Sequence, residues 1–144
     1  MLKTQLLHPE LLAALAVSGH FSQILVADAN FPVASLRGPN AKVVHLNLTP
    51  GVVDAPTVLD VLLGAIPVQA AAVMLPPADF APAIHELYRG RLGDEVRWER
   101  LERAAFYERI SSPRTTLIVA TAEARRFANL LLEVGVVKLP SENF

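Results

Sequence analysis

The chain contains no cysteine, so disulfides, a thiolate nucleophile and cysteine metal ligands are all excluded. Its seven glycines are dispersed, and neither the dinucleotide-binding pattern G-x-G-x-x-G nor the phosphate-binding pattern G-x-x-x-x-G-K-[ST] occurs. The patterns G-x-S-x-G and H-E-x-x-H are also missing, and the four histidines are isolated from one another in the sequence. We therefore expect no nucleotide site, no covalent hydrolysis and no metal site.

A basic surface is lacking as well. The 13 lysines and arginines are balanced by 14 aspartates and glutamates, for a net charge of -1, whereas a nucleic-acid partner would need a basic face. Charged residues make up 19% of the chain and apolar residues 52%, against roughly 25% and about 45–50% in ordinary soluble proteins. This apolar excess indicates burial between subunits, and we expect no nucleic-acid partner.

Long uninterrupted apolar runs are scarce. Residues 61–78 carry no formal charge and reach the roughly 18 residues that a membrane helix needs, but prolines, a glycine and a glutamine interrupt them. These interruptions favour a helix, a turn and a strand of a soluble domain. The N-terminal segment, with His8 and Glu10, is typical of a folded helix rather than of a signal sequence. We expect a cytoplasmic protein without a membrane segment.

The length suits one domain, which we assign to residues 1–144. Short apolar or alternating runs predict strands at 24–27, 42–48, 70–75, 96–98 and 115–120. Apolar periodicity and helix start and stop residues predict helices at 9–19, 54–64, 82–90 and 99–110. The pattern as a whole predicts an α/β domain with a central, mostly buried sheet and flanking helices.

Composition and residue spacing predict the structure of two further segments and one ion pair. Residues 31–41 are rich in proline, glycine, serine and asparagine and are expected to form a loop. Residues 122–137 combine helix-favouring and strand-favouring runs, and we divide them into a short helical turn and a closing strand. Glu99 and Arg103 stand four residues apart, the spacing of a stabilising ion pair on a solvated helix face.

A small group of polar side chains stands next to helix or strand ends, where α/β proteins tend to place chemistry. The group consists of His20, Asp28, Asn30, Tyr107 and Asn129. Several hydrogen-bonding groups with one imidazole, a group that ordinarily titrates near neutral pH, suit a polyhydroxyl ligand. The residues alone leave two plainer alternatives: His20 as a helix-end histidine bonded to terminal carbonyls, and Asp28 as a turn-forming aspartate.

Several short motifs follow one another along nearly the whole chain. They are P-E-L-L-x-x-L-A-x-x-G-H ending at His20, A-D-A-N-F-P at 27–32, F-Y-E-R at 106–109, T-A-E at 121–123, F-A-N at 127–129 and G-V at 135–136. In this order and spacing they resemble the fucose mutarotase and ribose pyranase family. The N-terminal run and F-Y-E-R are more similar to the fucose branch.

The resemblance implies a site and an activity. The histidine that matches His20 would be the proton donor. The matching sugar-binding side chains would be Asp28, Met74, Tyr107, Phe127 and Asn129. The implied activity is that of an isomerase, a mutarotase that interconverts anomers, or pyranose and furanose forms, of a monosaccharide such as L-fucose. An imidazole can give and take the protons that this needs near neutral pH, so no metal or organic cofactor is expected.

Four residues depart from the family pattern. Phe127 stands where a tyrosine is usual and lacks its hydroxyl, and Ala122 stands where a glycine is usual. Gln69 lies roughly where the fucose branch has a catalytic aspartate, and Arg103 lies where the ribose branch tends to have a histidine. Two alternatives to a fucose mutarotase therefore stay open: a D-ribose pyranase, and a sugar-binding or regulatory protein without catalysis.

The spacing of His20 and Asp28 bears on assembly. The eight residue steps between them, mostly strand, could span up to roughly 25 Å at about 3.3 Å per residue, too far for one sugar. Either the chain curls back after Gly19, or His20 of one subunit faces the Asp28 group of another. The high apolar content favours the second arrangement, and the resemblance implies ring-shaped assemblies, commonly decamers. We therefore predict a homo-oligomer with composite sites at subunit interfaces.

Overall fold

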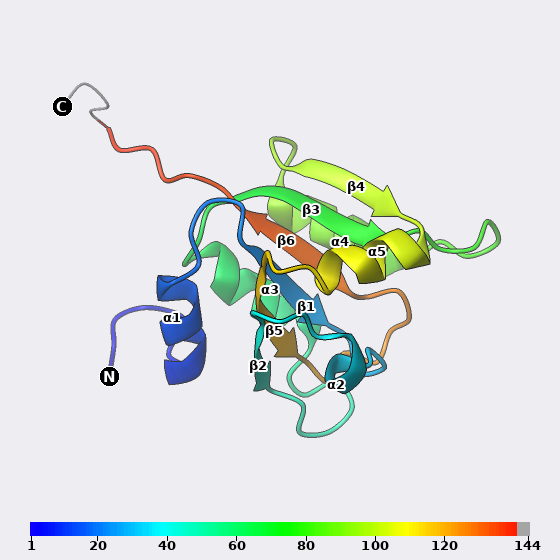
Figure 1. The fold of residues 1–144 in the computed structure, drawn as a ribbon, viewed down its shortest axis with the longest axis horizontal. Helices are drawn as coiled ribbons and strands as arrows, with labels where there is room; N and C mark the ends of the chain where they lie inside the picture. Colours follow the sequence, from blue (N-terminus) through cyan, green and yellow to red (C-terminus); the bar gives the residue numbers. More distant parts are fainter. Residues whose placement is uncertain (141–144) are drawn as a thin grey trace.

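Within residues 1–140, which the computed structural model describes, six strands form one mixed sheet with helices on both faces (Figure 1). The last four residues of the predicted 1–144 domain lie outside the described part. The strands are β1 (Gln23–Ala27), β2 (Lys42–His45), β3 (Val68–Met74), β4 (Arg97–Leu101), β5 (Thr115–Ala120) and β6 (Leu130–Val134). The helices are α1 (Pro9–Ala16), α2 (Val33–Leu36), α3 (Ala55–Leu63), α4 (Ala83–Leu92) and α5 (Arg103–Ile110).

The directions of the strands decide where the polar groups gather. In the order β2-β5-β1-β6-β3-β4, β6 runs antiparallel to both of its neighbours, and the other pairs are parallel. Five strands therefore point one way and β6, the orange arrow in Figure 1, points the other way. We call the edge where the five strands end the carboxyl edge; it comprises Ala27, His45, Met74, Leu101, Ala120 and the start of β6 at Leu130. The opposite edge, where β1 begins at Gln23 and β6 ends at Val134, is the amino edge.

Two apolar layers hold the helices on the sheet. α1, α3 and α4 pack on one face through a core that includes Leu11, Leu59 and Ile84. α2 and α5 cover the other face, where Phe106 and Ile110 of α5 are fully buried. β1 lies inside the sheet, and all of its residues are buried. The predicted α/β domain with a buried central sheet and flanking helices is confirmed.

Local sequence explains where the helices begin and end. Asp54 caps α3, because its Oδ1 accepts a hydrogen bond from the amide three residues further on at 3.1 Å. His8 caps α1 in the same way through Nδ1, at 3.4 Å. α1 ends at Ala16, earlier than the predicted stop at Gly19, because the Ser18 amide and hydroxyl bond back to carbonyls of the last turn.

The predicted helix over 99–110 is wrong in its first turn. Glu99 belongs to β4, and α5 begins only at Arg103. Glu99 accepts hydrogen bonds from Arg97 at 3.1 Å and from Arg109 at 2.9 Å, and no ion pair joins it to Arg103 among the described residues. Pairing of β4 with β3 outweighs the helical spacing, and no local pattern reveals that pairing.

Three other segments differ from the prediction. The expected loop over 31–41 contains the short helix α2. The strand expected over 42–48 ends three residues early, because the backbone turns back on itself between residues 46 and 53. Residues 122–129 form no helical turn and lead as an irregular segment into β6. The apolar stretch 61–78 does contain the end of a helix, a turn and a strand, and no helix in the described part is long and apolar enough to cross a membrane.

Candidate functional site

A hollow of about 270 Å³ opens at the carboxyl edge. It is lined by Asp28, Asn30, Phe31, Met74, Arg103, Tyr107, Arg126, Phe127 and Asn129. These residues come from the ends of β1 and β3, from α5 and from the segment before β6. They meet because parallel strands end at one edge, where open α/β sheets commonly bind ligands. The structure thus brings the five predicted sugar-binding side chains into one hollow, and it does not bring His20 there.

Asp28 and Asn129 form a buried clamp in this hollow. The Asp28 amide donates to Oδ1 of Asn129 at 2.8 Å, and Nδ2 of Asn129 donates to Oδ2 of Asp28 at 3.0 Å. Oδ1 of Asp28 accepts a hydrogen bond from the Asn30 amide at 3.0 Å, which closes the kind of turn that aspartate favours. The interpretation of Asp28 as a turn-forming aspartate is therefore correct, and the same residue also lines the hollow.

The environment of Asp28 sets what it can bind. Burial raises the pKa of Asp28 above its usual value, although backbone hydrogen bonds to the carboxylate act in the opposite direction. A carboxylate has about four lone-pair positions, two on each oxygen. The Asn129 side chain and neighbouring backbone amides use part of this capacity. Because Asp28 also lines the hollow, its carboxylate is the acceptor that a ligand hydroxyl would meet there.

The T-A-E motif holds the turn that carries Asp28. Thr121 donates twice to the Ala27 carbonyl, from its amide at 3.0 Å and from its hydroxyl at 2.7 Å. The Glu123 carbonyl accepts a hydrogen bond from the Ala29 amide at 2.9 Å. Both neighbours of Asp28 are thereby tied to the segment that follows β5. The T-A-E residues do not line the hollow themselves, but they hold the backbone on both sides of Asp28, which does.

The Glu123 side chain fastens two further segments together. Nε of Arg125 donates to Oε1 and Nη2 to Oε2 of Glu123, each at 2.8 Å, and the Ala55 amide at the start of α3 donates to Oε2 at 3.3 Å. Burial alone would raise the pKa of Glu123, but the hydrogen bonds from Arg125 outweigh it and hold that pKa below its usual value. The segment before β6 is thereby anchored to α3.

Phe127 has an uncommon backbone conformation, with a φ of 60°. Its carbonyl accepts a hydrogen bond from Nε2 of His85 at 2.7 Å, and the Ala128 carbonyl accepts one from the Tyr88 hydroxyl at 2.7 Å. Both donors are buried residues of α4. Burial lowers the pKa of His85, which favours the neutral imidazole, and raises the pKa of Tyr88. α4 therefore fixes the segment that presents Phe127 and Asn129.

Aromatic rings complete the hollow. Tyr107 meets Phe31 edge to face, with ring centroids 5.9 Å apart, and Phe127 meets Phe80 with centroids 5.6 Å apart. The Arg126 guanidinium lies 4.6 Å from the centre of the Phe80 ring, a cation–π arrangement. Tyr107 supplies a hydroxyl to the lining, whereas Phe127 supplies a ring without one.

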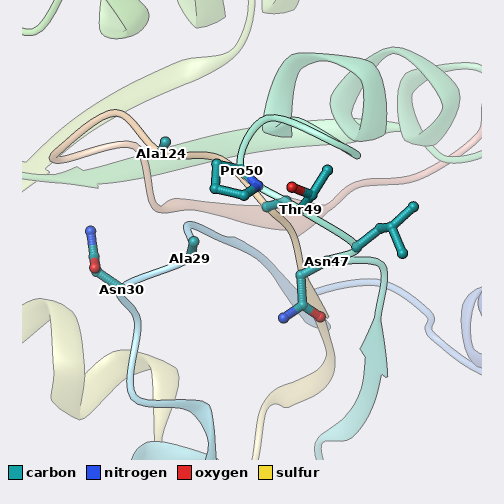
Figure 2. A pocket seen from close by; sticks show the side chains of 8 residues that line it. Ala29, Asn30, Asn47, Thr49, Pro50 and Ala124 are labelled. Atoms are coloured by element: carbon teal, nitrogen blue, oxygen red, sulfur yellow. The ribbon is translucent and has the colours of Figure 1, made fainter.

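A second hollow of about 430 Å³ adjoins the first and shares Asn30 with it. Figure 2 shows Asn30 next to Ala29 at one side of this hollow, with Asn47 and Thr49 of the segment after β2 across from them. Ala122 also lines it, and no titratable side chain does. The first hollow is the better candidate although it is smaller, because it gathers the Asp28 carboxylate with the other predicted sugar-binding side chains.

His20 lies at the amino edge, beyond the opposite end of β1 from Asp28. β1 alone spans about 16 Å at about 3.3 Å per residue, and the chain does not curl back to bridge that distance. The exposed imidazole stacks on Phe21 with ring centroids 3.7 Å apart, and its Nε2 lies 3.1 Å from Oε1 of Gln69. His20 is thus bonded to a side chain of β3 rather than to helix-end carbonyls.

Gln69 sets the orientation of His20. Its Nε2 donates to Oε1 of Glu133 at 2.6 Å, which turns its carbonyl oxygen towards the imidazole. A carbonyl oxygen only accepts, so His20 donates from Nε2, and Nδ1 of the neutral ring is left to accept a proton. Glu133 is bonded in turn to Arg114 at 3.2 Å. Gln69, which cannot act as a base, therefore belongs to a polar chain that holds the histidine.

Three residues of this region are not predicted as site residues from the sequence: Arg103, Arg126 and His85. Arg103 stands out in the sequence only as a departure from the ribose pattern, and Arg126 does not stand out, although it directly precedes the F-A-N motif. His85 carries no local signal, because its role depends on α4 lying against the segment before β6. Within residues 1–140 no group of three or more histidine, aspartate or glutamate side chains could hold a metal ion.

The chain is similar to known proteins along most of its length. Residues 1–137 match the RbsD / FucU transport protein family. Fucose mutarotase of Danio rerio is 33% identical over 144 residues, covering 91% of this chain and 90% of that protein. D-ribose pyranase of Variovorax paradoxus is 32% identical over 141 residues, covering 94% and 98%. The crystal structure of the fucose mutarotase from Streptococcus pneumoniae in complex with L-fucose is 32% identical, with a TM-score of 0.77, covering 91% of this chain and 94% of that one.

Proposed function

The chain belongs to the RbsD / FucU family, and from this membership we propose that it is a monosaccharide mutarotase that needs no cofactor. The observation that carries the proposal is the hollow at the carboxyl edge, where the Asp28–Asn129 clamp lies beside aromatic rings. Carboxylate oxygens accept hydrogen bonds from sugar hydroxyls, and rings offer an apolar surface to the sugar's C–H groups. L-Fucose and D-ribose, which appear in the names of the relatives, are the first substrates to test.

Mutarotation moves two protons and breaks one bond. A proton leaves the anomeric hydroxyl, the ring oxygen takes up a proton, and the bond between the anomeric carbon and the ring oxygen breaks to give an open-chain aldehyde. Rotation about the adjacent carbon–carbon bond and reversal of these steps form the other anomer. Asp28, Asn129 and Tyr107 are suited to hold the hydroxyl groups, and an imidazole is suited to exchange the protons near neutral pH.

We assign the proton exchange to His20 of a second copy of the chain. No histidine lines the hollow, whereas His20 is exposed at the amino edge. Large apolar side chains are exposed at the same edge. Phe21, next to His20, is 50% exposed, and Val136 and Val137, which follow β6, are 57% and 67% exposed. Exposed apolar groups of this size favour contact with another copy. We therefore expect the amino edge of one copy to meet the carboxyl edge of the next in a ring, and a decamer is the size we propose.

A second candidate function is a sugar-binding or regulatory protein without catalysis. Phe127 favours it, because the missing hydroxyl removes one hydrogen-bond donor and acceptor from the hollow. A D-ribose pyranase is a further candidate, which differs from a fucose mutarotase in the sugar rather than in the kind of chemistry.

Exchange between anomers, measured by NMR at equilibrium, separates these candidates. Wild-type protein is tested with L-fucose, D-ribose, D-galactose and L-rhamnose, and at least one should exchange faster than it does without protein. His20→Ala should abolish the acceleration, and His45→Ala, at an exposed histidine outside the hollow, should not. A folded His20→Ala protein that exchanges anomers at the wild-type rate would exclude His20. Sugar binding in calorimetry without any acceleration would favour the non-catalytic candidate.

Mixed subunits test the composite site. His20→Ala and Asp28→Ala, each inactive alone, should regain activity when they are co-assembled, because some interfaces then combine an intact histidine with an intact aspartate. Co-purification of the two variants, each carrying a different affinity tag, establishes that mixed assemblies form, and light scattering gives the size of the assembly. An active monomer at micromolar concentration, or demonstrable mixed assemblies without activity, would contradict the arrangement.

A further inference from the structure

A further hollow, of about 370 Å³, lies where β3 connects to α4, and we call it the α4 hollow. Its walls are residues 75–78 and 80–83, together with His85 and Glu86 of α4 and Arg100 of β4. The volume falls within the roughly 300–1,000 Å³ that is typical of ligand pockets. Three of the wall residues are prolines, whose fixed backbone angle stiffens the connection. The α4 hollow shares no lining residue with the hollow at the carboxyl edge.

The imidazole of His85 offers a hydrogen-bond acceptor to the α4 hollow. Its Nε2 donates to the Phe127 carbonyl, so Nδ1 of the neutral ring can only accept. Within residues 1–140, Nε1 of Trp98 is the one fully buried side-chain polar atom without a hydrogen-bond partner. Nδ1 of His85 has no partner among those residues either, so it must be open to solvent. His85 is 4% exposed and lines the α4 hollow, so this is where a ligand meets Nδ1.

Arg100 brings a positive charge to the same hollow. Burial is the main reason why the pKa of His85 is lowered, and the charge of Arg100 adds to the effect, which places the guanidinium near the imidazole. Arg100 is exposed, and the ion pairs in the described part of the chain all involve other arginines. The guanidinium is therefore available to an anion.

The start of α4 also favours an anion. The residue before this 10-residue helix is Pro82, which has no side-chain group to cap the first N–H groups. These groups carry the positive end of the helix dipole, and Ala83 at the first helical position lines the hollow. Glu86 acts in the opposite direction, but its carboxylate is exposed to water and lies 4.0 Å from Arg89, so its repulsion is weak.

We propose that the α4 hollow binds a small oxyanion that also carries a hydroxyl group, as hydrogen phosphate and 2-hydroxycarboxylates do. The anionic oxygens accept from Arg100 and from the first N–H groups of α4, and the hydroxyl donates to Nδ1 of His85. An anion without a hydroxyl leaves Nδ1 without a donor, and a neutral alcohol leaves Arg100 without a counter-charge. The site is separate from the hollow at the carboxyl edge and does not depend on the mutarotase function.

Two matched pairs of anions test the proposal: phosphate with sulfate, and glycolate with acetate. At pH 7.5 the members of each pair have similar charge, and only phosphate and glycolate carry a hydroxyl. Calorimetry at constant ionic strength measures the affinity of wild-type protein for each anion, because salt screens exposed charges. We expect saturable binding, and in at least one pair the hydroxyl-bearing anion should bind about two- to tenfold more tightly, which one hydrogen bond is worth. The pair that shows this preference distinguishes a phosphate from a hydroxy acid.

Two variants should fail in different ways. Arg100→Gln should weaken the binding of both members of the preferred pair by about tenfold or more, since hydrogen bonds to a charged group are lost. His85→Leu should remove the preference within the pair, because no acceptor is left for the hydroxyl. Arg103→Gln is the matched control: Arg103 is exposed, has no carboxylate partner within residues 1–140 and lines the hollow at the carboxyl edge instead. It should leave all affinities unchanged. If His85→Leu does not fold, Arg100→Gln decides alone.

Three results overturn the proposal. The first is that none of the four anions binds saturably to the wild type, and the second is that the members of both pairs bind equally well. The third is a loss of affinity in Arg103→Gln without a loss in Arg100→Gln, which would assign the anion to the other hollow. None of these measurements uses a neutral sugar or its anomer exchange, so failure of the mutarotase function would leave their outcome unaffected.

Discussion

Replacing Asn129 by aspartate should make the stability of the fold strongly dependent on pH. The exchange preserves size and keeps the oxygen that accepts from the Asp28 amide. It places a second carboxylate oxygen where Nδ2 of Asn129 now lies, 3.0 Å from Oδ2 of Asp28. The two residues are 7% and 5% exposed, so water screens the two carboxylates only weakly.

The size of the effect follows from two competing costs. Two unit charges about 3 Å apart repel by about 5 kcal/mol at an effective dielectric constant of about 20. Uptake of one shared proton relieves the repulsion, at a cost of about 1.4 kcal/mol for each pH unit above the usual aspartate pKa of about 3.9. The cheaper route at pH 7 is protonation, so the free energy of unfolding should fall by about 4 kcal/mol there and by about 1.5 kcal/mol at pH 5.

The sign follows from linkage. The paired carboxyls bind a proton more tightly in the folded chain than in the unfolded chain, so the stability is fully present below the unfolded pKa and is lost as the pH rises through the raised folded pKa. Urea denaturation of the wild type, Asn129→Asp and Asn47→Asp at pH 5 and pH 7 measures this at one chain concentration. The gap between wild type and Asn129→Asp should widen by about 2–3 kcal/mol. Asn47 is exposed, so its variant should show no widening; an equal gap for Asn129→Asp at both pH values would refute the clamp geometry.

Three further substitutions test the groups that surround the clamp. His85→Leu leaves the Phe127 carbonyl without its donor and should lower the free energy of unfolding by about 1–3 kcal/mol. Because burial lowers the pKa of His85, the stability that His85 contributes is present above the unfolded pKa of about 6.5 and shrinks as the pH falls. A difference in stability between wild type and variant that stays constant from pH 7.5 to 5.5 in denaturation experiments would contradict this. Glu123→Gln weakens the pair with the partly exposed Arg125 and should lower the free energy of unfolding by about 1–3 kcal/mol at pH 7. Because the pKa of Glu123 is lowered in the folded chain, this loss of stability should fade as the pH falls below about 4.5. An equal loss at pH 3 would speak against the pairing. Phe127→Tyr adds one possible hydrogen bond worth about 0.5–1.5 kcal/mol and should tighten sugar binding by about two- to tenfold in calorimetry; unchanged affinity for every sugar would mean that this ring edge does not face the sugar.

The fold could be predicted where the local pattern and the packing agree. Residues 24–27 and 115–120 are rich in apolar, β-branched side chains, and they form buried strands inside the sheet. Asp54 precedes an apolar helical pattern, and it caps the start of α3 as predicted. The prediction fails at Glu99, where pairing with a neighbouring strand overrides helical spacing. It fails again over 122–129, where helix-favouring residues are held in an irregular path by hydrogen bonds to groups distant in the sequence.

The antiparallel direction of β6 determines where Asn129 lies, and the sequence alone does not reveal that direction. Asn129 precedes β6, and a residue that precedes any other strand of this sheet lies at the amino edge; only the reversal of β6 carries Asn129 to Asp28. The same reversal carries Glu133, near the end of β6, to the Gln69 that orients His20. No local sequence pattern specifies this direction, because it depends on which neighbours pair with the strand. β6 therefore anchors both halves of the proposed composite site. If the amino edge of one copy meets the carboxyl edge of the next, each site is built on the β6 strands of two copies, so a change within β6 should disturb the hollow and the histidine together.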